Sequence, residues 1–155
     1  MITPAPGPSA PAFDLDHFLP YRLAAAADRV SAGLSHIYRA EAGLSVAEWR
    51  VLAHLFDAGP ASVRDIGARA GLEKSRVSRA AARLEAAGHI TRGPDPADRR
   101  LVCLELTGAG RALMAALLAH VLAYQATLEA RLGPLLAPLE RALDTLRAEG
   151  DQPRR

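Results

Sequence analysis

The segment from Val63 to Leu84 constrains the fold most, because it predicts two helices joined by one tight turn. A short helix capped by Ser62 precedes Gly71, and a second helix is expected from Lys74 to about Ala87. This arrangement is the anatomy of a helix-turn-helix, a motif that places its second helix in the major groove of DNA.

The second helix of this motif has two chemically different faces. Val77, Ala81 and Leu84 lie four and three residues apart, so they form the face expected in the core. Arginine forks match the acceptor edge of guanine, and a lysine near the helix start suits a phosphate. The candidate DNA contacts of this helix are Lys74, Ser75, Arg76, Ser78, Arg79 and Arg83. The alternative is a solvated arginine face on an ordinary amphipathic helix.

Positive charge is concentrated around this motif. Residues 61–100 hold nine Arg and Lys against five Asp and Glu, a net charge of +4 in a chain whose total is +2. A local basic block in a nearly neutral protein indicates one localised anionic partner rather than a general polycation.

A hairpin is expected directly after the motif. Two β-rich stretches, His89–Arg92 and Leu101–Leu106, are separated by a segment rich in Gly, Pro and Asp. Its basic tip, with candidate contacts Asp98, Arg99 and Arg100, predicts a wing that inserts Arg100 into the minor groove, with Asp98 orienting that arginine. The alternative is a polar turn with incidental charges.

Helices are expected on both sides of this region. Residues 13–42 predict a long helix with Leu23, Val30, Leu34 and Ile37 on one face. Ser45 and Glu48 form a capping box that opens a helix to about Asp57. The side chains expected to point inward from this helix are Trp49, Leu52 and Phe56.

The fifth expected helix, from Thr107 to Leu132, is apolar on more than one face. A sixth follows Gly133 and Pro134. One stripe of the fifth helix is Leu113, Leu117, Val121, Tyr124, Leu128 and Leu132, and a second is Met114, Leu118 and Leu122; the sixth helix carries Leu135, Leu139, Leu143 and Leu146. One stripe suffices to pack a helix on its own domain, so the second predicts burial against another copy of the chain. The alternative is closure within one chain.

Two motifs resemble those of the multiple-antibiotic-resistance regulator (MarR) family. Asp98-Arg-Arg100, five further residues and Leu106-Thr107 match its wing signature, and the run Lys74–Arg79 is similar to its recognition helix. Leu44 to Leu52 also resembles its second helix, and the likeness covers about residues 13–148. The resemblance implies a homodimeric winged-helix repressor or activator that binds a pseudo-palindromic operator.

The fold class expected is therefore mainly α with a small β wing. The expected organisation is a tail at 1–12 and one domain at 13–150, with dimerisation helices at 13–44 and 108–150 and a winged helix-turn-helix lobe at 45–107. The family also implies release of DNA by a small, often aromatic, effector. Candidate ligand contacts are Tyr21, Arg22, Trp49 and His54, although packing in the core or exposure on the surface explains these residues equally well.

No enzymatic function is expected. The five histidines are scattered, and neither a metal-ligand motif nor a glycine-rich cofactor loop is present, so no metal or cofactor is expected. The single cysteine, Cys103, excludes an intrachain disulfide and is expected to be a small strand residue. No signal peptide is recognised, so a cytoplasmic location is expected. Two alternative functions remain, a sequence-tolerant architectural DNA binder and a winged-helix module for protein interaction.

Overall fold

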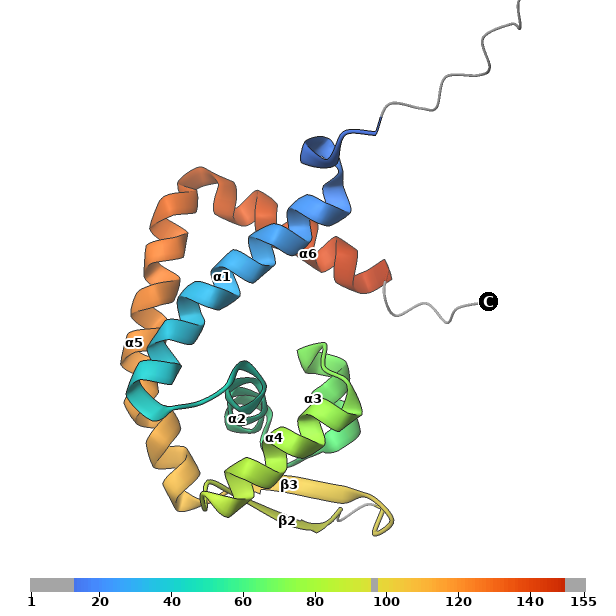
Figure 1. Cartoon of the computed structure of the whole chain (residues 1–155), viewed down its shortest axis with the longest axis vertical. Coiled ribbons are helices and arrows are strands. Elements are labelled where there is room, and N and C mark those ends of the chain that lie inside the picture. The colour runs from blue at the N-terminus through green and yellow to red at the C-terminus, as the bar shows by residue number, and fades with distance from the viewer. Residues whose placement is uncertain (1–12, 96–97, 150–155) are drawn as a thin grey trace, which may run out of the picture. The chain divides into compact units, whose positions relative to one another are not determined.

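The computed structural model of the chain describes residues 13–95 and 98–149 (Figure 1). The expected tail at 1–12, part of the wing tip at 96–97 and the C-terminal end from 150 lie outside the described residues. The expected fold class, mainly helical with a small β wing, is confirmed. The elements in chain order are η1 (Leu15–His17), α1 (Leu19–Ala42), α2 (Val46–Ala58), β1 (Ala61–Ser62), α3 (Val63–Ala70), α4 (Lys74–Ala86), β2 (Ile90–Pro94), β3 (Val102–Leu106), α5 (Gly108–Leu132), η2 (Gly133–Leu135) and α6 (Leu136–Glu149).

Packing divides the chain into two compact units, the first ending at Gly33 within α1. In this first unit, the prediction of one continuous helix from residue 13 is wrong at its start, because a separate short helix precedes α1. Asp14 caps the short helix η1, and Phe18 has an extended backbone that separates η1 from α1. Pro20 falls in the first turn of α1, where its missing N–H leaves no hydrogen bond unmade.

The second unit, from Leu34 onward, contains the hydrophobic core. Helices α2, α3 and α4 pack together beside the strands (Figure 1). The core side chains with 2% exposure or less include Tyr38, Val51, Leu52, Leu55, Ile66, Val77, Leu84, Ile90, Leu104, Met114 and Leu117.

Helix α2 turns a different face to the core than the sequence pattern predicted. Val51, Leu52 and Leu55 are buried, whereas Phe56 is 40% exposed, so its expected inward position is wrong. Phe56 follows Leu55 by one residue, which rotates it about a quarter turn away from the buried stripe. Trp49 is half-buried and stacks on Tyr38 with ring centroids 5.2 Å apart.

The sheet has three antiparallel strands in the order β1-β3-β2. In the hairpin, Ile90 pairs with Leu106 and Pro94 with Val102. The two-residue strand β1 was not expected; it pairs Ser62 with Cys103 and brings the start of α3 against the wing.

The start of α5 is joined to the turn between α4 and β2 by a close backbone approach. Thr107 caps α5 by accepting from the Gly110 amide at 3.0 Å, and its hydroxyl donates to the Gly88 carbonyl at 2.7 Å. The Thr107 amide donates to the His89 carbonyl at 3.0 Å. A Cβ at Gly110 would lie 2.1 Å from that same carbonyl oxygen, so only glycine fits without displacing the backbone.

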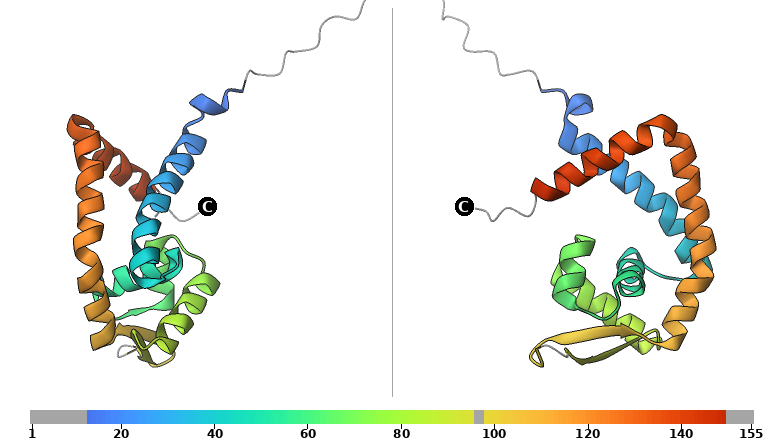
Figure 2. Two further views of the ribbon diagram at one scale, coloured as in Figure 1. Left: turned by 60° about the vertical axis from the view of Figure 1, so that its left-hand side comes forward. Right: turned by 180° about the vertical axis from the view of Figure 1, so that it is seen from behind.

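The rest of α5 and all of α6 expose apolar side chains. Met114 and Leu117 are buried in the unit's own core, but Leu122 is 55% exposed. Leu135 lies in η2 rather than in the sixth helix, and Leu139, Leu143 and Leu146 of α6 are also exposed. Figure 2 shows α5 extending away from the sheet before the chain reverses into α6.

Residues Gly108–Ala148 form the one helical stretch of the described chain that is long and apolar enough to cross a membrane. The most apolar 18-residue window of this stretch has a mean hydropathy of 1.3, and only 11% of that window is buried. One such stretch is weak evidence for a membrane segment, and a protein partner would cover the same side chains.

Candidate nucleic-acid interface

Helix α4 separates its core residues from its basic residues as the sequence predicts. Val77 and Ala81 are fully buried, whereas Arg76 and Arg79 are exposed on the other side. Lys74 and Ser75 are exposed in the first turn. Ser78 is only half-exposed, so it lies at the edge of this face rather than at its centre.

The turn before α4 is fixed by local interactions and one long side chain. Ser62 caps α3 by accepting from the Asp65 amide at 3.1 Å, and its own hydroxyl donates to the Asp65 carboxylate, which lowers the pKa of that group. Gly71 ends α3 in the left-handed region with φ of 63°. The Arg50 guanidinium donates to the Ala70 carbonyl at 3.1 Å, which satisfies one open acceptor at the end of α3.

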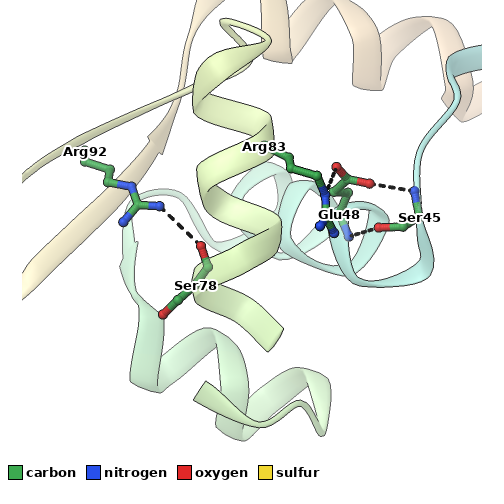
Figure 3. Close-up of polar contacts among 5 residues, drawn as sticks. All are labelled: Ser45, Glu48, Ser78, Arg83 and Arg92. Carbon is green, nitrogen blue, oxygen red and sulfur yellow. Dashed lines mark hydrogen bonds and ion pairs between the residues drawn. The ribbon is translucent and has the colours of Figure 1, made fainter. Parts of the chain in front are cut away.

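Glu48 connects the start of α2 to the last turn of α4 (Figure 3). One carboxylate oxygen accepts from the Ser45 amide at 2.8 Å, and the other accepts from Arg83 Nε at 2.9 Å. Burial alone would raise the pKa of Glu48, but the hydrogen bonds from Ser45 and Arg83 overcome it and hold the pKa below its usual value. Arg83, expected to contact DNA, is therefore also part of an ion pair within the protein.

Arg92 attaches strand β2 to α4, an interaction that sequence reasoning missed. Its Nε lies 2.8 Å from the Glu85 carboxylate, and its guanidinium donates to the main-chain carbonyl of Ser78 at 3.3 Å (Figure 3). The sequence does place the opposite charges of Glu85 and Arg92 seven residues apart, but only the geometry of the hairpin brings the two side chains together. The wing is thereby held directly against the recognition helix.

At the wing tip the structure gives Asp98 a different partner from the expected one. Its carboxylate accepts from the backbone amide of Arg100 at 3.0 Å, and its own amide donates to the Asp95 side chain at 3.0 Å. Asp98 thus shapes the main chain of the turn, which then presents Arg99 and Arg100, both exposed.

The nine basic residues of 61–100 divide into two groups. Four form ion pairs with nearby carboxylates, namely Arg64, Arg69, Arg83 and Arg92. Within the described part of the chain, the other five have no salt bridge: Lys74, Arg76, Arg79, Arg99 and Arg100. These five all belong to α4 or the wing tip, so the uncompensated charge lies where DNA contacts were expected.

Two of the candidate ligand contacts, Trp49 and His54, line one groove between α2 and α3. The groove is largely open to solvent and has a volume of about 430 Å³; its other lining residues are Arg50, Ala53, Asp57, Arg69 and Ala70. Burial, followed by the charge of Arg69, lowers the pKa of His54. The remaining candidates, Tyr21 and Arg22, are exposed on α1 in the first unit.

Cys103 is buried on β3, and burial raises the pKa of its thiol, which favours the unreactive protonated form. No group of three or more His, Cys, Asp or Glu side chains among the described residues could hold a metal ion.

The fold and these motifs match known proteins. The model of the MarR family matches residues 42–101. The crystal structure of the MarR family transcriptional regulator SPO1453 from Silicibacter pomeroyi DSS-3 is 33% identical, with a TM-score of 0.74, over 87% of this chain and 99% of that one. The chain belongs to the MarR family. It is therefore a transcriptional regulator by family, and such regulators bind DNA and dimerise.

Two further comparisons show how far the likeness extends. The HTH-type transcriptional regulator TtmR from Methylorubrum extorquens (strain PA1) is 37% identical over 70 residues, 45% of this chain and 36% of that relative. CouR from Rhodococcus jostii RHA1, bound to p-coumaroyl-CoA, has a TM-score of 0.75 at 22% identity over 93% of this chain and 99% of that one, so it shares the fold.

Proposed function

We propose that the protein is a homodimeric repressor that binds a pseudo-palindromic DNA operator in a sequence-specific manner and releases it when a small aromatic ligand binds. DNA binding is supported mainly by the five basic side chains of α4 and the wing tip that form no salt bridge with any described residue. Arg76 and Arg79 are three residues apart on one exposed helix face, so both can reach base edges in the major groove.

The exposed leucines of α5 and α6 support the proposal that the protein forms a homodimer. Leu122, Leu143 and Leu146 have 45–55% of their surface exposed, although burial of a leucine side chain stabilises a structure by about 1.5–3 kcal/mol. A second copy that covers these side chains would present two recognition helices. A dimer with two-fold symmetry requires two DNA half-sites about one helical turn apart, and this requirement predicts a pseudo-palindromic operator.

The groove that Trp49 and His54 line supports the proposal that a small effector binds the protein. Its volume of about 430 Å³ lies within the usual range for small-molecule sites. Its lining combines the indole ring of Trp49 with the guanidinium of Arg50, which suits an aromatic acid, while Arg69 in the same lining is paired with Asp57. The proposed location is the cytoplasm, where a regulator meets the chromosome.

The test is a competition between two duplexes. Randomised double-stranded DNA is selected on the protein, and the affinity for the selected duplex is compared with that for an unrelated duplex of equal length. A regulator of this kind should favour the selected duplex by about 10³-fold or more at physiological salt. A ratio near one would instead identify a sequence-tolerant architectural protein, and no binding even at low salt would identify a protein-interaction module.

A further inference from the structure

Arg83 differs from the other basic side chains of α4 because it already has a carboxylate partner. Its Nε lies 2.9 Å from Glu48, whose side chain is only 12% exposed. Arg76 and Arg79 have no salt bridge within the described residues. A guanidinium that neutralises a protein carboxylate contributes less net charge to a phosphate than a free one does.

Glu48 is held in place independently of Arg83. Its second oxygen accepts from the Ser45 amide at 2.8 Å, and its own amide donates to the Ser45 hydroxyl at 3.3 Å. This capping box belongs to α2, whose Val51, Leu52 and Leu55 are anchored in the core. The ion pair therefore connects α4 to a fixed point 35 residues earlier in the chain.

We propose that Arg83 is a positioning residue, which sets the angle and rotation of the recognition helix through Glu48 and thereby determines DNA specificity without gripping the DNA itself. Arg76 lies seven residues before Arg83, two turns along the same helix face. A small rotation of α4 about its axis therefore moves Arg76 and Arg79 away from base edges, while phosphate contacts tolerate the change. This inference rests on the DNA-binding function proposed above.

The test uses Glu48→Gln, Arg83→Gln and the double variant in the full-length protein. The Ser45 amide and Arg83 Nε donate to different oxygens of the Glu48 carboxylate. Glutamine carries an oxygen at only one of these two positions, so it can preserve the capping box while Arg83 faces an amide NH₂ group, which is itself a donor. Glu73→Gln is the matched control, because Glu73 is an exposed acid at the start of α4 with no side-chain capping bond. Thermal unfolding followed by circular dichroism confirms that each variant is folded.

Each protein is titrated with the selected and the unrelated duplex at several salt concentrations. The proposal predicts that both single variants lose about five- to tenfold affinity for the selected duplex and little for the unrelated one. The double variant should lose no more than either single variant, because all three break one interaction. Arg83→Gln should leave the salt dependence unchanged, and the control should bind as wild type or more tightly.

A direct phosphate contact by Arg83 predicts the opposite pattern. Arg83→Gln would then reduce the slope of log affinity against log salt by about 0.9 for each phosphate that is no longer neutralised. Glu48→Gln would bind both duplexes as well as or better than wild type, since it removes a negative charge. Either result, or unchanged preference in both single variants, overturns the positioning role. Failure of the wild-type protein to distinguish the two duplexes would instead refute the proposed function.

Discussion

Gly110→Ala tests the junction between the DNA-binding lobe and α5. The new Cβ would lie 2.1 Å from the His89 carbonyl oxygen, where ordinary contacts are 3.4 Å or longer. The backbone must therefore move by more than an ångström at this point. The same carbonyl accepts from the Thr107 amide at 3.0 Å, so the movement also weakens that hydrogen bond.

The expected loss of stability follows from three contributions. Overpacking of a tight site costs about 1–3 kcal/mol, and a broken backbone hydrogen bond costs about 1 kcal/mol. Replacement of glycine by alanine in a helix returns up to about 1 kcal/mol. The free energy of unfolding should fall by about 2 kcal/mol, which lowers the Tm of a chain of this size by about 4–8 °C.

Urea unfolding followed by circular dichroism, at one fixed protein concentration, measures this change. Gly108→Ala is the matched control, because it lies in the same helical turn and its Cβ would meet nothing within 4 Å. The control should be as stable as wild type or slightly more stable. Equal unfolding midpoints for the two variants would refute the close approach at Gly110.

Three further predictions concern the wing, the capping box and the dimer. Asp98→Ala removes a negative charge near DNA yet should weaken binding, because the Arg100 amide loses its acceptor and the turn loosens; tighter binding in an operator titration would contradict this. The pKa of Glu48 lies below its usual 4.5, so the stabilising contribution of the carboxylate is present at neutral pH and is lost as the pH falls through that lowered value. In the Glu48→Gln variant, the free energy of unfolding should therefore fall less steeply below pH 4.5. Urea titrations at each pH measure this free energy. Leu122→Glu should weaken dimerisation by light scattering, because a buried unpaired charge is costly. Leu117 does not suit this test, because it is buried in the lobe's own core and its replacement would unfold the lobe.

Local interactions were predictable from the sequence. The capping box of Ser45 and Glu48 and the caps formed by Ser62 and Thr107 all appear as expected, because a cap depends on residues only three positions apart. The buried face of α4 was predictable for the same reason. The two-residue strand β1 was missed, since it exists only through its pairing with β3.

Long-range partners could not be predicted in the same way. The exposed side of α4 was expected, but the pairing of Arg83 with Glu48 joins residues 35 positions apart. Likewise, sequence reasoning assigned Asp98 to the Arg100 side chain, while the turn geometry brings its carboxylate to the Arg100 backbone amide. Both differences arise because a polar side chain has several acceptable partners, and only the folded backbone selects one.

In the proposed function, the exposed face of α4 reads base sequence. The most direct measurement selects randomised DNA on the wild type and on Arg79→Ala, and compares base preference at each position together with affinity at fixed salt. Arg79→Ala should lose about 1–3 kcal/mol of binding free energy for the sequence that the wild type selects, and it should relax base preference at the positions that Arg79 reads. Lys74→Ala should weaken binding to all sequences about equally. Unchanged affinity and unchanged preference in the Arg79 variant would contradict this role of α4.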